Sequence, residues 1–217
     1  AASTAWIACG TGASRDAASA TEPGAEPPPL AGDGGLRVLG PTGAEVEPMS
    51  LGGEGILRTH GRAAEAVPMV LEVLRLGVRY IDTAPAYGAS QDYIGEALRE
   101  AGPTARQQVF LASKTHDRTR DGARRLLDDS LARLGTDKLD LWQMHDLRST
   151  ADLDAIFGPG GAIEAAVAAR DEGLIRFIGL TGHHDPQVLV EGMRRFAFDT
   201  VLCAFNPADA RRRPFLT

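Results

Sequence analysis

Four side chains of different chemical types stand close to the ends of short apolar runs in this sequence. Asp82, Lys114 and His145 each end such a run, and Tyr87 follows Asp82 by five residues. An acid, a phenol, an amine and an imidazole that meet in one place are suited to moving protons. We therefore expect proton-transfer chemistry if the fold brings these four side chains together.

The apolar runs themselves recur along the chain at intervals of 25 to 36 residues. They are continuously apolar, which is typical of strands buried on both faces. The five runs occupy residues 78–82, 109–114, 139–145, 175–180 and 200–205. A sixth, earlier strand is expected at 48–53.

The stretches between the runs have the apolar spacing of helices. One helical face is expected to carry Ala123, Leu127, Leu131 and Leu134, another Ile163, Ala166, Val167 and Arg170, and a third Tyr93, Ile94, Ala97 and Leu98. Glycines that favour a left-handed helix end follow these stretches, at Gly77, Gly102, Gly135 and Gly173. Asp185-Pro186 is typical of a helix start, and Pro68 indicates a helix that begins or bends there.

Strands that alternate with helices at this spacing predict an α/β fold with a parallel sheet. A (β/α)8 TIM barrel collects its catalytic groups at the C-terminal ends of its strands, as expected here, and usually needs about 250 residues. Residues 36–217 hold about six βα units. We therefore expect a barrel that is incomplete at its C-terminus, in a fragment of a longer protein.

Composition excludes several classes of function. The net charge is −6 and of mixed sign, so a nucleic-acid-binding surface is not expected. No apolar run is long enough for a transmembrane helix. Cys9 and Cys203 are the two cysteines, and they form neither a disulfide framework nor a metal-binding pattern.

Residues 1–35 differ from the rest because they are rich in Ala, Gly, Pro, Ser and Thr. We interpret them as a disordered linker, or as the remnant of an export signal in which Cys9 would accept a lipid. The protein would then be exported or lipid-anchored. On the linker interpretation it would be cytoplasmic.

Four motifs, in order, resemble the aldo-keto reductase family. They are GVRYIDTAPAYGASQDYIGEALRE at 77–100, VFLASK at 109–114, SLARLGTDKLDLWQMH at 130–145 and EGLIRFIGLTGH at 172–183. The resemblance covers about residues 36–217. The TGH sequence at 181–183, after the fifth expected strand (175–180), is similar to a less-studied bacterial branch of that family.

The resemblance implies catalytic roles for Asp82, Tyr87, Lys114 and His145. Tyr87 would act as general acid in the NADP(H)-dependent reduction of an aldehyde or ketone, or in the reverse oxidation of an alcohol. Lys114 would lower the pKa of the phenol, Asp82 would balance Lys114, and His145 would orient the carbonyl oxygen. The partner would be a small carbonyl compound, and the oligomeric state stays open.

The expected cofactor contacts depart from the family pattern. Thr181 and Gly182 stand where relatives hold the nicotinamide carboxamide with Ser-Asn, and Leu202 replaces a glutamine. Asn206 is a candidate to replace the lost amide. This departure keeps open an alternative, a non-catalytic nucleotide-binding or regulatory relative.

Each candidate also has a structural interpretation when it is taken alone. Asp82 would serve as a cap, Tyr87 as a loop aromatic, Lys114 as a strand-end lysine that extends to solvent, and His145 as a hydrogen-bonded core histidine. Their joint placement at successive strand ends favours catalysis. A metal site is not expected, because the ligand-type side chains of His116, His183, His184 and Asp185 are poorly spaced for it.

Overall fold

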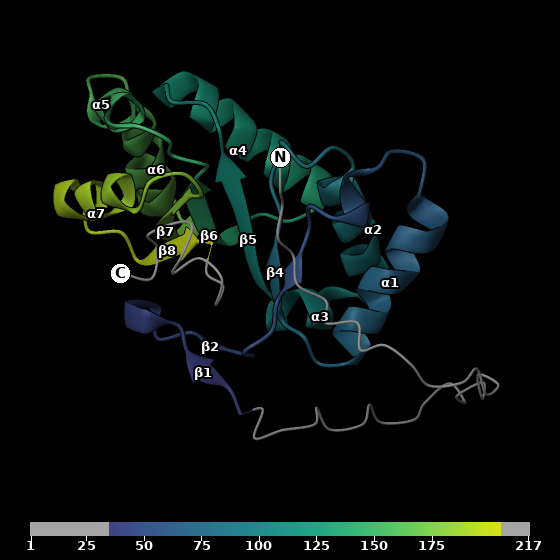
Figure 1. Ribbon diagram of the computed structural model, residues 1–217. Helices are drawn as coiled ribbons and strands as arrows, with labels where there is room; N and C mark the ends of the chain where they lie inside the picture. The colour runs from purple at the N-terminus through teal and green to yellow at the C-terminus, as the bar shows by residue number, and fades with distance from the viewer. Residues whose placement is uncertain (1–34, 205–217) are drawn as a thin grey trace, which may run out of the picture.

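A computed structural model describes residues 35–204, and its centre is a parallel sheet that curls into half of a barrel (Figure 1). The six strands lie in chain order, β3-β4-β5-β6-β7-β8, and every neighbouring pair is parallel. Their bounds are Leu51–Gly52 (β3), Tyr80–Asp82 (β4), Phe110–Thr115 (β5), Leu139–Met144 (β6), Ile175–Gly182 (β7) and Thr200–Cys203 (β8). This is the predicted α/β arrangement over six strands of a TIM barrel.

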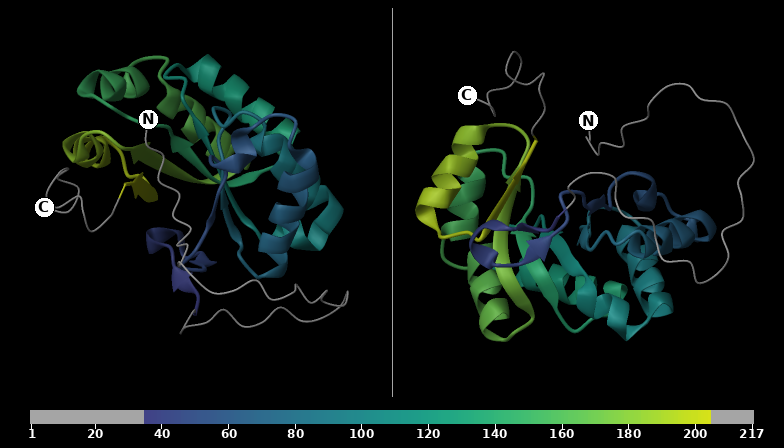
Figure 2. Two further views of the ribbon diagram at one scale, coloured as in Figure 1. Left: turned by 45° about the vertical axis from the view of Figure 1, so that its right-hand side comes forward. Right: turned by 90° about the horizontal axis from the view of Figure 1, so that it is seen from below.

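The helices cover the outer, convex side of the sheet (Figure 2). Two short 3-10 helices, η1 (Gly40–Thr42) and η2 (Ile56–Arg58), come first in the chain. The helices of the convex side are α1 (Ala63–Arg75), α2 (Ser90–Ala101), α3 (Pro103–Gln108), α4 (Arg120–Leu134), α5 (Thr150–Phe157), α6 (Ala162–Asp171) and α7 (Pro186–Arg195). The main hydrophobic core lies between these helices and the sheet. None of the helices found within 35–204 has the length and apolarity needed to cross a membrane.

The five predicted runs all form strands, and their bounds shift by only a few residues. The expected strand at 48–53 is confirmed as β3, which is two residues long. Residues 1–34, with the linker and export interpretations, and Asn206 lie outside the described residues.

The helix ends follow the predicted signals. Gly77, Gly102, Gly135 and Gly173 all have positive φ angles, between 64° and 85°. The side chain of Asp185 caps α7 by accepting a hydrogen bond from the backbone N–H of Gln187 at 2.9 Å. Pro68 lies inside α1, which begins five residues earlier. The predicted helical face that included Arg170 is wrong at that residue, which is exposed, while Ala169 is buried in its place.

Strand alternation divides the side chains into an outer and an inner set. Ile81, Leu111, Trp142 and Ile178 belong to the core beneath the helices. The residues beside them point into the barrel, and they include a small apolar cluster of Phe110, Ala112 and Leu141. Asp82, Lys114 and Gln143 continue this inner set toward the C-terminal ends of the strands.

A short antiparallel hairpin, β1 (Arg37–Val38) with β2 (Glu45–Val46), is the one part of the sheet structure that the sequence did not predict. Val46 packs against the inner apolar cluster, together with Leu39 and Ala44 of the connecting turn. The hairpin lies below the sheet in Figure 1, at the N-terminal ends of the strands. It therefore covers the inner face at the end opposite to the catalytic candidates.

Candidate active site

The four sequence-predicted side chains meet at the C-terminal ends of the strands. Asp82 is the last residue of β4, Lys114 lies near the end of β5, and His145 directly follows β6. Since residues two apart share a face of a strand, the inner alternation brings all three to the same concave surface. Tyr87 reaches the same place from the loop between β4 and α2.

Lys114 and Asp82 form a buried ion pair, in which the lysine side chain is 1% exposed and the aspartate side chain 16%. The Lys114 ammonium also donates to the carbonyl oxygen of Thr83 at 3.1 Å. On its other side, Asp82 accepts a hydrogen bond of 2.9 Å from the Gln143 side-chain amide. Gln143 thus joins the site, although its position inside an apolar run gave no sign of this in the sequence.

Tyr87 lies between the lysine and the histidine. Its hydroxyl is 3.5 Å from Nε2 of His145, and its ring centroid is 4.7 Å from Nζ of Lys114. The loop that carries Tyr87 depends on Gly88, which has a φ angle of 51°. A Cβ atom at Gly88 would lie 2.2 Å from the carbonyl oxygen of Arg58, so only glycine fits this turn.

The electrostatics of Tyr87 differ in part from the sequence expectation. Burial raises the pKa of the phenol above its ordinary value, whereas the Lys114 cation lowers it and the Asp82 carboxylate raises it. The effect of Lys114 therefore has the predicted sign, but burial outweighs it, so the pKa of the phenol lies above its ordinary value. Tyr87 keeps its proton at neutral pH.

His145 is neutral at physiological pH. Burial, together with the Lys114 cation, lowers the pKa of its imidazole to about 3. Its Nδ1 atom is buried and has no hydrogen-bond partner among residues 35–204. The ring therefore presents Nε2 to Tyr87, while no hydrogen bond at Nδ1 from the described part of the chain fixes the orientation of the ring.

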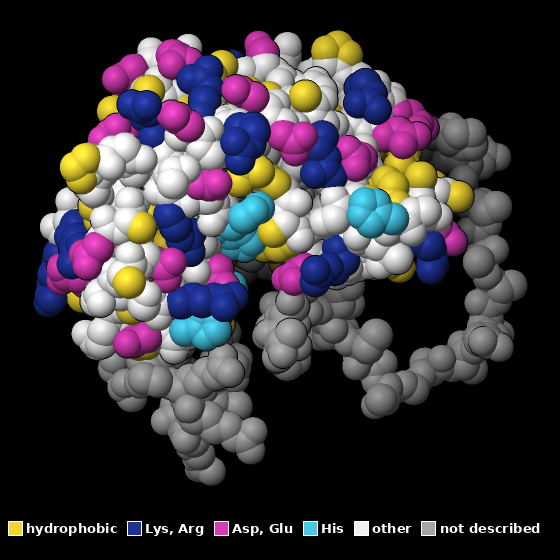
Figure 3. All heavy atoms as spheres, turned by 90° about the horizontal axis from the view of Figure 1, so that it is seen from above, with side chains coloured by type: hydrophobic (Ala, Val, Ile, Leu, Met, Phe, Trp, Pro, Cys, Tyr) yellow, Lys and Arg dark blue, Asp and Glu magenta, His cyan; other side chains and the backbone are white. Residues whose placement is uncertain are grey.

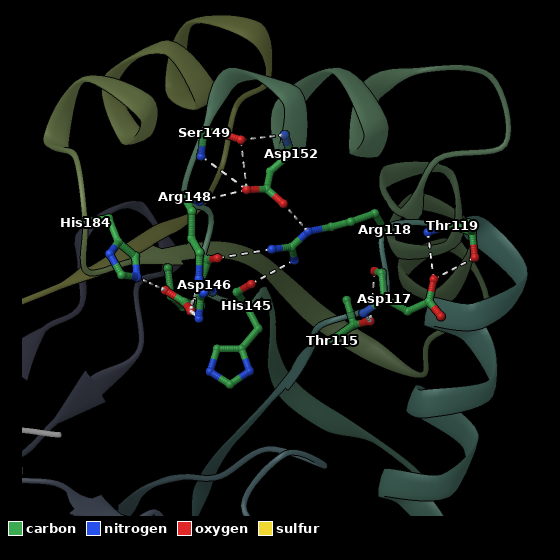
Figure 4. A network of polar contacts seen from close by, with 11 residues as sticks. Thr115, Asp117, Arg118, Thr119, His145, Asp146, Arg148, Ser149, Asp152 and His184 are labelled. Atoms are coloured by element: carbon green, nitrogen blue, oxygen red, sulfur yellow. Dashed lines mark hydrogen bonds and ion pairs between the residues drawn. The ribbon is translucent and has the colours of Figure 1, made fainter. Parts of the chain in front are cut away.

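The backbone around His145 is held by a network of polar contacts (Figure 4). Arg118, in the loop between β5 and α4, donates to the carbonyl oxygens of His145 and Asp146 at 2.8 and 3.1 Å. It also donates to the carboxylate of Asp152 at 3.0 Å, and Asp152 closes a capping box with Ser149 at the start of α5. Sequence reasoning missed Arg118, because a lone arginine after a strand carries no spacing signal.

A hollow of about 480 Å³ adjoins His145 on this face of the molecule. Basic, acidic and histidine side chains are intermixed around the hollow that Figure 3 shows from above. Its lining consists of Ala86, His116, Arg118, His145, Asp146, Arg148 and Asp152. Arg118 pairs with Asp152 and Arg148 with Asp146, so the lining is polar while its arginine and aspartate charges compensate one another.

The predicted cofactor residues lie at the end of β7, beside this network. The hydroxyl oxygen of Thr181 accepts a hydrogen bond of 2.8 Å from the backbone N–H of Asp146, which leaves its own O–H as a donor. A Cβ atom at Gly182 would lie 2.8 Å from Cδ2 of Leu189 and 2.9 Å from the carbonyl oxygen of Leu147. Local packing thus explains the glycine, and Leu202, paired with Thr181, supplies no amide.

Comparisons with known proteins agree with this architecture. The model of the aldo/keto reductase family matches residues 48–214. L-galactose dehydrogenase of Arabidopsis thaliana is 34% identical over 157 residues, which cover 68% of this chain and 48% of that protein. The chain spans about half the length of the curated relatives it matches.

Solved structures show the same likeness. A putative aldo-keto reductase from Pseudomonas aeruginosa aligns with a TM-score of 0.69 at 30% identity, over 82% of this chain and 71% of that one. An aldo/keto reductase from Klebsiella pneumoniae, in complex with NADP and acetate, aligns with a TM-score of 0.59 at 24% identity, over 73% and 53% of the two chains, and supports the fold alone. The family model spans most of the sequence, and the candidate site lies at the strand ends that the family's motifs predict, so this chain belongs to the aldo/keto reductase family.

Proposed function

We propose that this chain carries the proton-transfer site of a nicotinamide-dependent oxidoreductase that interconverts a carbonyl compound and its alcohol. The observation that supports this most directly is the placement of the Tyr87 hydroxyl, 3.5 Å from Nε2 of His145 and beside the buried Lys114–Asp82 pair. The relatives include dehydrogenases and reductases by name. The chemistry of such enzymes needs a positioned acid and a group that polarises the carbonyl oxygen.

Each residue has a role in carbonyl reduction. A carbonyl oxygen placed between Tyr87 and His145 accepts a hydrogen bond from the neutral imidazole. When the carbonyl carbon receives hydride, its oxygen gains negative charge and takes the proton of the Tyr87 hydroxyl. The Lys114 ammonium stabilises the phenolate that remains, and Asp82, held by Gln143, keeps Lys114 in place.

The bound nicotinamide cofactor supplies the hydride in this proposal, and NADP(H) is the form we infer. Among the described residues, the Thr181 hydroxyl fits a carboxamide contact because its O–H remains a donor. Gly182 and Leu202 offer no side-chain amide for the same contact. A relative from Saccharomyces cerevisiae, 34% identical over 104 residues, is named glycerol 2-dehydrogenase (NADP(+)), which supports a nicotinamide cofactor without deciding between NADP and NAD for this chain.

The hollow beside His145 indicates the substrate class. Apart from Ala86 its lining is polar, and its ion pairs leave hydrogen-bonding groups with little net charge. Such a surface suits a small, neutral, hydroxylated aldehyde or ketone better than an apolar one. L-galactose dehydrogenase, one of the relatives, is named for a substrate of this kind.

The alternative function is nucleotide binding without catalysis. The observation that favours it is the loss of the carboxamide-binding side chains at Gly182 and Leu202. Titration of the full chain with NADPH and NADH, followed by the fluorescence of the reduced nicotinamide, measures binding. Turnover assays on the same samples then separate a binding protein from an enzyme.

The decisive variant is Tyr87→Phe. It should bind NADPH as the wild type does but reduce carbonyl compounds at least about 100-fold more slowly, because the positioned acid is lost. Tyr80→Phe is the matched control, since Tyr80 lies on the same inner face but packs against Phe110 near the hairpin. Near wild-type turnover by Tyr87→Phe would exclude Tyr87 as the acid.

Substrate class is tested with a matched pair of three-carbon aldehydes. The wild type should show a kcat/KM for glyceraldehyde at least about tenfold higher than for propanal, because propanal leaves the polar lining of the hollow unpaired. An equal or reversed ratio would contradict the proposed preference for hydroxylated substrates.

A further inference from the structure

The arginine that holds the loop after β6 lies outside the four-residue site, yet its contacts converge on the backbone of His145. Arg118 makes three hydrogen bonds through its guanidinium, and its carbonyl oxygen accepts the backbone N–H of Ala162 at 2.8 Å. Its side chain is 21% exposed. Arg118 is thus held at its backbone by the start of α6 and at its guanidinium by the loop after β6 and by Asp152 of α5.

The loop requires such support because of its conformation. Asp146 has a φ angle of 51°, and it is the one residue other than glycine within 35–204 with a positive φ. An L-residue pays for this left-handed conformation, although Asp tolerates it better than most. The turn is maintained by Arg118, which binds the carbonyl oxygen of Asp146, and by Thr181, which accepts its N–H.

The loop backbone is also what orients the catalytic ring. Histidines in active sites are commonly held through the second ring nitrogen by a carboxylate or a carbonyl group. Here Nδ1 of His145 has no such partner among the described residues. Figure 4 shows the imidazole on the side of the loop away from Ser149 and Asp152, while Arg118 meets the backbone from the β5–α4 side.

We propose that Arg118 is a positioning residue that sets the place of the His145 imidazole against Tyr87 by fixing the carbonyl groups of His145 and Asp146. Its catalytic meaning rests on the proposed function, whereas the coupling between Arg118 and the ring does not. A bidentate contact to two successive carbonyls needs the planar fork of arginine. Lysine at this position retains the charge but cannot reproduce the geometry.

The histidine signals of the protein provide a direct test. The chain has five histidines, so a protein labelled with carbon-13 in its imidazoles gives five ring signals, and His145→Gln identifies the signal of His145. The His145 ring lies edge-on to Tyr87, with centroids 5.5 Å apart and an interplanar angle of 86°. The field of the tyrosine ring therefore makes the His145 shift sensitive to small movements.

Arg118→Met and Arg118→Lys should both move or broaden the His145 signal and leave the His60 signal unchanged. Arg120→Met is the matched control, because Arg120 is an exposed arginine two residues away that pairs with Asp121 and Glu164. It should leave all five signals in place. If Arg118→Met does not fold, the same test can be made with Arg118→Lys or with Asp152→Asn. The Asp152→Asn change weakens the contact between Arg118 and the carboxylate of Asp152, so it should also move or broaden the His145 signal.

Kinetics separate positioning from direct substrate binding. If Arg118 acts through His145, kcat falls by about tenfold to a hundredfold in Arg118→Met, since small misplacements of a catalytic group are costly, while KM changes by a smaller factor than kcat. A raised KM with an unchanged His145 signal would show that Arg118 binds substrate instead and would overturn the proposal. An unshifted His145 signal in a folded Arg118→Lys or Arg118→Met protein overturns it without any assay of turnover, so its failure is distinct from that of the proposed function.

Discussion

Three influences, two that raise and one that lowers, act on the pKa of the Tyr87 hydroxyl. Burial and the Asp82 carboxylate both disfavour the phenolate, and the Lys114 ammonium 4.7 Å from the ring favours it. In the proposed reaction, the net result keeps the proton on Tyr87 until the oxygen of the substrate becomes basic enough to take it. A reductase needs this balance, because an acid that ionises early has no proton to give.

Replacement of Lys114 tests this balance through the pH dependence of reduction. As the proposed acid, Tyr87 must be protonated to act, so the rate should stay level at neutral pH and fall as the pH passes the pKa of the phenol, which lies above its ordinary value. Lys114→Met removes the cation that lowers this pKa, so the alkaline fall should move to higher pH while kcat decreases. The measurement is a pH–rate profile with the chemical step shown to be limiting by an isotope effect.

The double variant Lys114→Met/Asp82→Asn is the control for this prediction. It removes the influence of Asp82, which raises the pKa, together with that of Lys114, which lowers it, so its alkaline fall should lie nearer to that of the wild type. An alkaline fall that does not move in the single variant would contradict the coupling of Lys114 to Tyr87.

The sequence predicted the four residues of the site, but it did not predict Gln143 and Arg118, which hold those residues in place. Asp82, Lys114 and His145 stand at strand ends, where parallel topology alone brings them together. Gln143 lies in the middle of an apolar run, and its contact with Asp82 depends on which residues face inward. Arg118 acts on backbone carbonyls 27 and 28 residues away, a relation that leaves no local pattern.

Among the elements, the loops after β6 and β7 approach each other closely at Gly182. The backbone N–H of Leu147 donates to the carbonyl oxygen of Thr181 at 2.8 Å, so the two loops share hydrogen bonds at this point. Gly182 allows that approach because a side chain would collide with Leu147 and Leu189. The amide expected at this position from the family pattern has no space unless the loops separate.

Gly182→Ala should therefore destabilise the protein by about 1–3 kcal/mol and lower activity, because the added methyl group meets a backbone oxygen that cannot move alone. Gly192→Ala in α7 is the comparison, since its added Cβ meets only the ends of the Leu180 and Leu153 side chains, at 3.0 and 3.3 Å. Chemical denaturation of both variants measures the difference. A cost at Gly182 no larger than that at Gly192 would show that the loops adapt freely.

At the scale of the whole molecule, the buried neutral His145 links stability to pH. Its pKa is about 3 in the folded protein, against an ordinary value near 6.5 in the unfolded chain. Between these values the unfolded state binds a proton that the folded state does not, so stability falls as the pH drops below 6.5. The expected loss between pH 8 and pH 5 is about 2 kcal/mol from this group.

His145→Gln should remove that part of the pH dependence. Free energies of unfolding at pH 8 and pH 5 measure it, and the wild type should lose about 2 kcal/mol more than the variant over this interval. Equal losses in the two proteins would mean that His145 titrates normally in the fold.

The overall fold was predictable where an element carries a recognisable sequence pattern, such as a long apolar run or a glycine at a helix end. The long strands β5, β6 and β7 are continuously apolar, and the glycines with positive φ end the helices where the sequence places them. The β1–β2 hairpin escaped prediction because each of its strands has two residues, too few to show an alternation. Its role depends on Val46 contacting Phe110 and Leu141, which are distant in the sequence.

The burial of Lys114 has a consequence for chemical labelling. The chain contains two lysines, Lys114 and Lys138, beside 21 arginines. Lys138 is exposed, whereas Lys114 is 1% exposed and paired with Asp82. An amine-acylating reagent therefore modifies Lys138 readily and reaches Lys114 only when the ion pair opens. Acylation of this single buried amine, quantified by mass spectrometry, reports how often the candidate active site opens, without a substrate or an introduced probe.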